Sequence, residues 1–489
     1  MKKINIAIIS MFILIMAGTV FAENAQTPAD TELKEGKWIE MSQRYPLTAM
    51  SDKSVSEPNP DILAKWWESF NDEVLTQLVE WSLQSNRDLV SARSKVTEAR
   101  AALGISKAAL LPWFDNTNYW FNTRTPVDTG GRAKGMDIYR LSLDASWEID
   151  IFGGRKQSVK AGVASLEAQY ASLHASWVSL SAEVALNYLT LRTLQERLLI
   201  AEKNLFLQED TLDMLQSRVD AGLIDHLALN QSKYTLEQTK AQIPPIKSSI
   251  EEVKNNLAVL TGVVPGSLDS MLDEIKPLPR LGYEMMIGIP ANSIRQRPDI
   301  FMAERQLVAQ IARKKSAKAD LWPKFYLLGS IGTEALNTGS LFEGPSKLYS
   351  FGPKIVWPIF HGGAIRNNIK VQTAREEQYL AAYEQTVLKA VGEVRNALTA
   401  GIEERNRNEA LKRGVEAAQT ALDVANDKYM NGLTDFNNVI NAQRALLSLS
   451  EALAVSDGQI TSDSVRLFKA LGGGWAPLNA EYELLENKK

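Results

Sequence analysis

Histidine and cysteine, two residue types that often carry catalysis or bind metals, are scarce in this chain. Its 489 residues include 3 histidines and no cysteine. His174, His226 and His361 are far apart in the sequence, and none belongs to a metal-ligand motif. The run Gly472-Gly473-Gly474 lacks the lysine and the strand-to-helix context of a phosphate-binding loop. We therefore expect no enzyme activity, no cofactor and no bound metal.

A short charged element occurs twice and is the most specific pattern in the chain. Its two copies share a basic residue, three intervening residues, Gly-Leu, one further residue and Asp: Arg218, Gly222, Leu223 and Asp225, then Lys428, Gly432, Leu433 and Asp435. Glycine can adopt the left-handed conformation that ends a helix, and aspartate can cap the next helix. Each element therefore predicts a turn between two helices.

The spacing of about 210 residues between these elements recurs elsewhere and indicates an internal duplication. It also relates Leu111-Pro112-Trp113-Phe114 to Trp322-Pro323-Lys324-Phe325, Ile151-Phe152-Gly153-Gly154 to Ile359-Phe360 with Gly362-Gly363, and Leu260-Thr261-Gly262 to Leu471-Gly472-Gly473. We expect a first repeat over 61–275, a second over 276–475, and a C-terminal tail over 476–489.

Each repeat contains a long segment with helical character. Residues 155–221 and 365–431 lack proline, and their apolar residues recur every three or four positions. At 1.5 Å per residue each helix would be roughly 100 Å long and would need coiled-coil partners. Another helix should run back from each turn, broken or kinked in the first repeat by Pro244-Pro245. Two further helices are expected over 86–111 and 299–321.

Alternating residues predict strands between the shorter and longer helices. Within 139–151 one face is apolar, and the other carries Arg140, Ser142, Asp144, Ser146, Glu148 and Asp150. We expect one hairpin over about 113–151 and another over about 325–360. A half-exposed soluble sheet would show the same pattern, but strands of about ten residues with aromatic ends also suit an outer membrane. Four strands cannot close a barrel, so copies would share one, and three copies would give twelve strands and a lumen.

The N-terminus resembles an export signal. Lys2 and Lys3 precede an apolar run that ends at Ala22, which predicts a signal peptide over 1–22; the run is short for a membrane anchor. The absence of cysteine excludes a lipid anchor on cysteine, and 23–60 should form an extended strap or a disordered segment. A formal charge of −4 with interspersed signs does not favour nucleic-acid binding.

Together these features resemble the TolC-like outer-membrane efflux factors, in particular the OprM and NodT branch. The resemblance covers roughly 63–475 and rests on Trp66-Trp67, Asn86-Arg87-Asp88-Leu89, Trp147-Glu148-Ile149-Asp150, Ile243-Pro244-Pro245, Arg297-Pro298-Asp299-Ile300 and Ala470-Leu471-Gly472-Gly473-Gly474-Trp475. It implies a mainly α fold and a homotrimer in outer-membrane lipid, with a 12-stranded β-barrel continuous with a periplasmic α-helical barrel. It also implies docking to a periplasmic adaptor protein and an inner-membrane transporter.

The resemblance assigns roles to the charged residues. Asp435, and less clearly Asp225, would form a periplasmic gate, although either could simply cap a helix. Adaptor contacts would come from Arg218, Gly222, Leu223, Lys428, Gly432 and Leu433, which could instead pack the turns together. Asp144, Glu148 and Asp150 would line the barrel lumen, unless Arg140 and Lys354 neutralise them in local pairs.

The function implied is a passive exit duct for small molecules such as drugs, toxic compounds or metal ions. A duct for secreted proteins would have the same architecture, and the sequence does not separate these uses. A trimeric coiled-coil structural protein or adhesin would also use long helices, but the duplicated hairpins argue against it.

Overall fold

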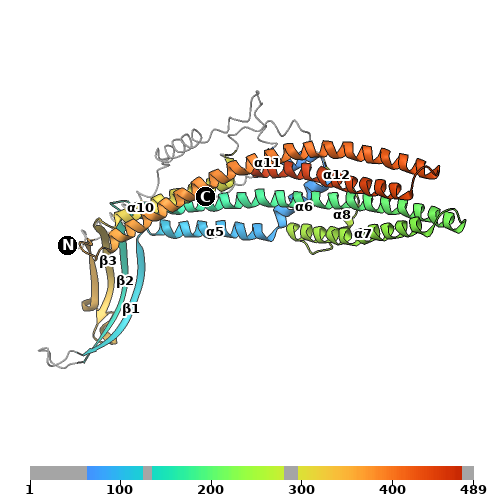
Figure 1. Cartoon of the computed structure of the whole chain (residues 1–489). Helices are drawn as coiled ribbons and strands as arrows, with labels where there is room; N and C mark the ends of the chain where they lie inside the picture. Colours follow the sequence, from blue (N-terminus) through green and yellow to red (C-terminus); the bar gives the residue numbers. More distant parts are fainter. Residues whose placement is uncertain (1–62, 125–134, 280–293, 295, 476–489) are drawn as a thin grey trace. The chain divides into compact units, whose positions relative to one another are not determined.

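The computed structural model describes residues 63–124, 135–279, 294 and 296–475 (Figure 1). These residues belong to one compact unit that begins at Glu57. The expected signal peptide, the whole of the expected strap and the C-terminal tail lie outside the described residues. Within the described ranges, none of the helices combines the length and apolarity needed to cross a bilayer.

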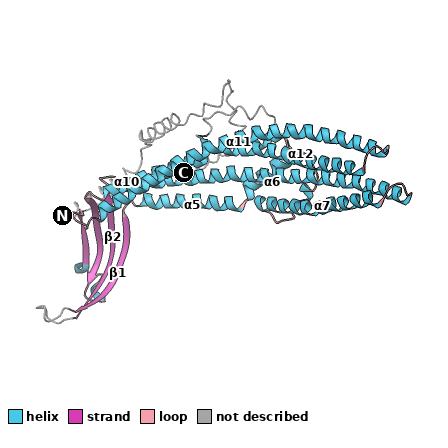
Figure 2. Cartoon of the chain, viewed as in Figure 1, coloured by secondary structure: helices cyan, strands magenta, loops and turns pink. Residues whose placement is uncertain are grey.

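Four antiparallel strands form one sheet in the order β1-β2-β3-β4 (Figure 2). Their bounds are Trp113–Arg124, Gly135–Ile149, Lys324–Ala335 and Lys347–Val356. The two hairpins join because β2 pairs with β3, with Tyr139 opposite Ala335. The expected strand over 139–151 begins four residues earlier and ends two residues earlier, since Ile151 already lies in a turn closed by its N–H on the Ile149 carbonyl at 2.9 Å.

The two long helices have equal length in the two repeats. α6 spans Gly154–Asp220 and α11 spans Ala364–Met430, each with 67 residues. Each follows a glycine in the left-handed region, Gly153 at φ +75° and Gly363 at φ +81°. A side chain there would be strained, so these glycines allow the chain to turn sharply from the sheet region into each helix.

A return helix follows each long helix. α7 spans His226–Thr261 and α12 spans Phe436–Ala470. Of the two expected outcomes at Pro244-Pro245, the break is wrong, because both prolines lie inside the continuous helix α7. The carbonyls that would have paired with their missing amides belong to Lys240 and Ala241, and all four residues are exposed. Water can therefore satisfy these carbonyls, which lowers the cost of the two prolines.

Shorter helices complete the chain. They are η2 (Trp66–Phe70), α4 (Glu73–Ser85), α5 (Arg87–Ala108), α8 (Asp269–Leu272) and α10 (Pro298–Ala319), with the 3-10 turns η5 (Thr338–Ser340) and η6 (Gly344–Ser346) between β3 and β4. Asn86 separates α4 from α5, and its side chain accepts hydrogen bonds from the amides of Asp88 and Leu89 at 2.9 and 3.1 Å. This cap starts α5 where the sequence predicts a helix.

α6 forms the centre of the helical packing. It contacts α4, α5, α7, α10 and α12, while α11 packs mainly on α10 and α12. The largest apolar cluster joins both ends of the described chain, since Trp66 stacks on Phe468 with ring centroids 5.5 Å apart. Tyr188 and Leu189 of α6 are fully buried in the same cluster. This cluster packs the start of the described chain and the end of α12 against the middle of α6.

Candidate functional sites at the sheet and the helical turns

The sheet has one apolar and one polar face. The pairing register places on the apolar face Phe114, Asn116, Asn118, Trp120, Tyr139, Leu141, Leu143, Trp147, Ile149, Phe325, Leu327, Ile331, Tyr349, Phe351 and Ile355. The polar face carries Asp115, Thr117, Arg140, Ser142, Asp144, Glu148, Ser330, Glu334, Ser350 and Lys354, with a few aromatic and aliphatic residues. Such a division suits a sheet between an apolar medium and water.

Asp144 lies on the polar face in a local network. Its Oδ2 atom accepts a hydrogen bond from the Ser142 hydroxyl at 3.2 Å, and its Oδ1 atom lies 3.7 Å from a guanidinium nitrogen of Arg140. The same guanidinium lies 3.6 Å from the Glu334 carboxylate. Arg140 therefore offsets part of the acidic charge of this face.

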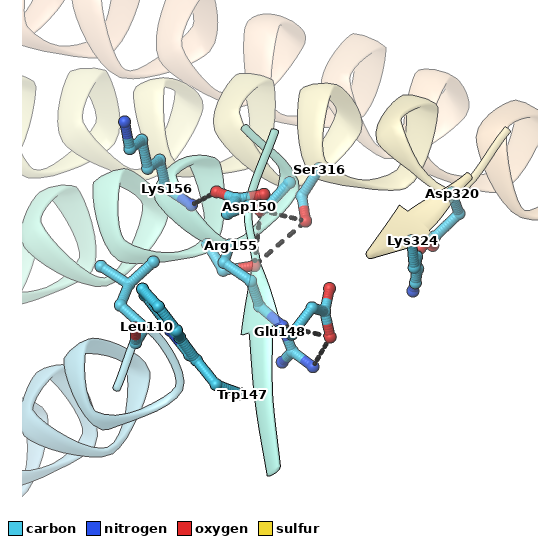
Figure 3. Close-up of polar contacts among 11 residues, drawn as sticks. Leu110, Trp147, Glu148, Asp150, Arg155, Lys156, Ser316, Asp320 and Lys324 are labelled. Atoms are coloured by element: carbon cyan, nitrogen blue, oxygen red, sulfur yellow. Dashed lines mark hydrogen bonds and ion pairs between the residues drawn. The ribbon is translucent and has the colours of Figure 1, made fainter. Parts of the chain in front are cut away.

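Glu148 and Asp150 lie where the sheet meets the helices (Figure 3). The Glu148 carboxylate accepts a hydrogen bond from Arg155 of α6 at 2.8 Å. Asp150 lies one residue beyond β2, and its Oδ2 atom accepts from the backbone amide of Lys156 at 2.7 Å. Placing Asp150 on the strand was therefore wrong, because its carboxylate satisfies a free amide in the first turn of α6. Lys354 shares a cross-strand row with Glu148 through Tyr326.

Two indole groups connect the sheet to the helices. In the first repeat, Trp147 Nε1 donates to the Leu110 carbonyl at 2.9 Å, just beyond the end of α5. In the second, Trp357 Nε1 donates to the Leu321 carbonyl at 3.3 Å, just beyond α10. Each bond satisfies a carbonyl that the helix end leaves without a partner. The duplicated bond holds both hairpins against the helix that precedes them.

The repeated Gly-Leu-x-Asp elements form the two turns that join α6 to α7 and α11 to α12. Gly222 and Gly432 are left-handed, at φ +67° and +72°. The amides of Leu223 and Leu433 donate to the carbonyls of Arg218 and Lys428 at 2.9 and 2.8 Å. These are Schellman motifs, in which glycine permits the reversal and the following amide satisfies a terminal carbonyl.

Asp225 and Asp435 both cap the return helices. Asp225 Oδ1 accepts from the Leu227 amide at 2.9 Å, and Asp435 Oδ1 accepts from the Asn437 amide at 2.7 Å. The capping role considered for them from the sequence is thus present at both positions. It leaves the second carboxylate oxygen of each group available for other contacts.

The remaining residues of the turns differ in exposure. Leu223 and Leu433 are 72% and 74% exposed. Lys428 is exposed, whereas Arg218 is half-buried with its guanidinium 5.3 Å above the Tyr429 ring. Tyr429 belongs to an apolar cluster with Leu215, Leu229, Leu422, Phe436, Val439 and Ile440, drawn from all four helices. Arg218 therefore packs the two turns together, while both leucines project away from that cluster.

A family model supplies the decisive comparison. The model described as "Outer membrane efflux protein" matches residues 78–263 and again residues 289–473, one match in each repeat. The chain belongs to the outer membrane efflux protein family. It is an outer-membrane exit duct of the kind that serves tripartite efflux systems.

Relatives of this efflux protein match most of its length. It is 30% identical to nodulation protein T of Rhizobium leguminosarum bv. viciae, over 88% of this chain and 89% of the relative. It is also 30% identical to the toluene efflux pump outer membrane protein TtgF of Pseudomonas putida, over 86% and 88% of the two chains. The solved outer-membrane channel OprN is 31% identical, with a TM-score of 0.81 over 87% of this chain and 98% of that one.

One contact between the repeats of this efflux protein was not predicted from the sequence. Arg444 of α12 donates to the Tyr234 hydroxyl at 2.9 Å and to the Thr235 hydroxyl at 3.2 Å, both on α7. The 210-residue spacing marks Tyr234 and Arg444 as equivalent positions of the two repeats. Whether their side chains meet depends on how α7 and α12 are rotated about their axes, which the spacing does not specify.

The described part of the chain has no group of three or more His, Asp or Glu side chains that could hold a metal ion. His174 stacks between Trp177 and Trp475, with ring centroids 5.2 and 5.5 Å away. Burial between these indoles lowers the pKa of His174 to about 4, so its ring is neutral near pH 7.

Proposed function

We propose that three copies of this chain form a duct through the outer membrane, with four strands from each copy in one 12-stranded barrel. The observation that carries the proposal is the sheet itself. Within the described residues, β1 and β4 each have a strand partner on one side only. Unpaired amides and carbonyls at these edges cannot remain in hydrocarbon, so the edges require further strands.

Twelve strands suit a conduit better than eight. An eight-stranded barrel is nearly filled by its own side chains, whereas twelve strands leave a lumen. In this assembly the polar face with Asp144 and Glu148 lines the lumen, and the apolar face contacts lipid. The helices of the three copies continue the duct as a helical barrel in the periplasm.

The two turns are the proposed docking site for a periplasmic adaptor, which connects the duct to an inner-membrane transporter. Leu223 and Leu433 are the most exposed apolar side chains of the turns and have no packing partner within them. Lys428 is exposed beside Leu433, so it is the basic residue best placed for the adaptor. Gly222 and Gly432 hold both leucines at the outer end of each turn.

Asp435 is the proposed gate residue. Three copies of it near the axis would form a narrow acidic ring that attracts cations, and opening would require the helices to move apart. Its Oδ1 atom caps α12, but the second oxygen and the full negative charge remain available to the pore. Asp225 caps α7 in the same way and is the second candidate.

Small molecules are the proposed cargo. Support comes from the related protein TtgF, which is named for toluene efflux. We further propose export by a cleaved signal peptide over 1–22, without a lipid anchor on cysteine.

The test is reconstitution of the purified protein into planar bilayers together with measurement of its subunit mass. The expected result is a trimer with small, discrete, cation-selective conductance steps, as a shared barrel with an acidic constriction requires. A protein that remains monomeric, or that never conducts, would contradict the duct.

A further inference from the structure

Two cations lie on the apolar face of the sheet at the end remote from the helices. Arg124 is the last residue of β1, and Lys347 is the first residue of β4. Arg124 lies opposite Gly135, and Lys347 lies opposite Thr333, which places both side chains on the apolar face. Both residues are exposed, and neither forms an ion pair with a residue of the described part of the chain. Both charges lie at the remote end of a face that carries mainly apolar and aromatic side chains nearer the helices.

An aromatic pair marks the level of the membrane surface on this face. Trp120 stacks on Tyr139 with ring centroids 6.4 Å apart and an interplanar angle of 19°. Trp and Tyr concentrate where hydrocarbon gives way to headgroups, since their rings are apolar and their polar atoms reach water. Arg124 lies four residues beyond Trp120, roughly 13 Å farther along the strand. It therefore reaches the headgroup layer.

The nearby carboxylate is held by neutral groups. Asp137 lies on the same face opposite Asn122. Its Oδ1 atom accepts hydrogen bonds from Trp120 Nε1 at 3.0 Å and from Asn122 Nδ2 at 2.9 Å. These bonds orient the carboxylate along the sheet, and it forms no ion pair with Arg124 within the described residues. The Arg124 guanidinium therefore has no carboxylate partner among the described residues.

Within one copy, Arg124 and Lys347 lie on opposite edge strands of the sheet. In the proposed assembly, Arg124 of one copy lies next to Lys347 of the neighbouring copy. In a shared barrel, β4 of one copy lies antiparallel to β1 of the next. β1 ends at the remote end of the sheet and β4 begins there, with 12 and 10 residues respectively. The proposed pairing places these two strand ends next to each other. Arg124 of one copy then meets Lys347 of the next.

We propose that each seam between copies binds a phosphate group of an outer-leaflet lipid through Arg124 and Lys347. A phosphorylated headgroup fits because guanidinium binds phosphate oxygens in pairs and lysine adds a point charge. The lipid chains would lie along the apolar face below, beside residues such as Tyr349 and Phe351. The site exists only between copies, so it rests on the shared barrel proposed above. Its consequence is that the lipid bridges neighbouring copies.

The experiment measures lipid binding to the purified, detergent-solubilised assembly by native mass spectrometry. The probes are lipid A with its phosphates and the same lipid with the phosphates removed. Wild-type protein should bind the phosphorylated lipid at least about 10-fold more tightly, a preference within reach of two charged contacts. The variant Arg124→Gln/Lys347→Gln should lose that preference. Lys354→Gln, on the same strand but on the polar face, should retain it.

Two results would overturn the lipid site alone. One is equal binding of both lipids by a wild-type trimer that conducts, and the other is an unchanged preference in the double variant. Subunit mass and conductance of the same preparation distinguish these outcomes from failure of the duct itself. A wild-type chain that stays monomeric and does not conduct would remove both the duct and the seam on which this site depends.

Discussion

The two long helices come from equivalent positions of the repeats but have different surroundings. α6 packs against five other helices, whereas α11 packs mainly on two. Val178 of α6 is 6% exposed, while Leu388, its equivalent in α11, is 40% exposed. The two equivalent helices therefore occupy different places in the fold: α6 is surrounded by other helices of the same chain, and α11 lies at the edge of the helical packing.

The difference shows where the chain expects a neighbour. Val371, Ile402 and Val424 of α11 are also exposed apolar residues. Scattered residues of this kind are common on surfaces, and α6 also carries some, such as Leu199 and Phe206. In the proposed trimer the exposed apolar residues of α11 contact the next copy.

The strongest test removes a buried side chain from α6 and an exposed one from α11. Leu189→Ala should lower the free energy of unfolding by about 3 kcal/mol, because it leaves a cavity around a fully buried position. Leu388→Ala should cost less than about 1 kcal/mol in the dissociated chain and act mainly on trimer dissociation. Denaturant unfolding followed by circular dichroism measures both. Equal losses in the dissociated chain would contradict the comparison.

His174 gives a pH test of the α6 environment, since the equivalent residue in α11 is Glu384. Burial lowers the pKa of His174 to about 4. Between that pKa and the ordinary value of about 6.5, the unfolded chain binds a proton that the folded chain does not, so stability falls as pH falls. From pH 7 to pH 5 the expected loss is about 2 kcal/mol. The thermal midpoint of His174→Phe should not show the part of the pH dependence that His174 causes. An identical pH dependence in the variant and the wild type would refute this role of His174.

The two turns can be separated by their aspartates. Asp225→Ala and Asp435→Ala should each cost about 1 kcal/mol, because each removes a helix cap. Thermal unfolding measures that common effect. Only Asp435→Ala should raise single-channel conductance in planar bilayers. Unchanged conductance and cation selectivity would remove Asp435 from the gate, and an equal rise in Asp225→Ala would assign the gate to both turns.

The smallest effect concerns two tyrosines near the turns. Tyr234→Phe should cost about 0.5 kcal/mol, because it removes the hydroxyl that accepts from Arg444 but leaves the ring beneath the guanidinium. Tyr429→Phe is the matched control. The buried Tyr429 hydroxyl has no hydrogen-bond partner in the described part of the chain, so its loss should be neutral or slightly stabilising. Equal thermal midpoints for the two variants would show that the Arg444 contact is not formed in solution.

Periodic features of the fold could be predicted from the sequence. The repeat spacing, the proline-free long helices and the alternation before Ile149 each leave a regular pattern along the chain. Local environment decided the rest. Pro244-Pro245 does not break α7 because its surroundings are exposed, and Asp150 leaves the strand because an amide of α6 needs an acceptor.

Contacts between repeats were harder to predict than the repeats themselves. For Arg218 the sequence left two roles open, contact with a partner protein and packing between the turns, and its guanidinium lies over the Tyr429 ring of the second repeat. Such a contact depends on how two helical pairs rotate against each other, which neither residue type nor spacing specifies. The exposure of Leu223 and Leu433 could be predicted, since a two-residue reversal leaves them no core to enter.

The open edges of β1 and β4 also have a genetic consequence. In a shared barrel the edge strands of every copy pair with strands of both neighbours. One defective copy therefore prevents the barrel from closing even when the other two copies are normal. A chain with a proline in β1 that still docks through its helices should therefore act as a dominant-negative allele when expressed beside the normal gene. With equal expression, most rings would contain at least one such chain, and the cell would lose most of its ducts while half of its protein remained normal.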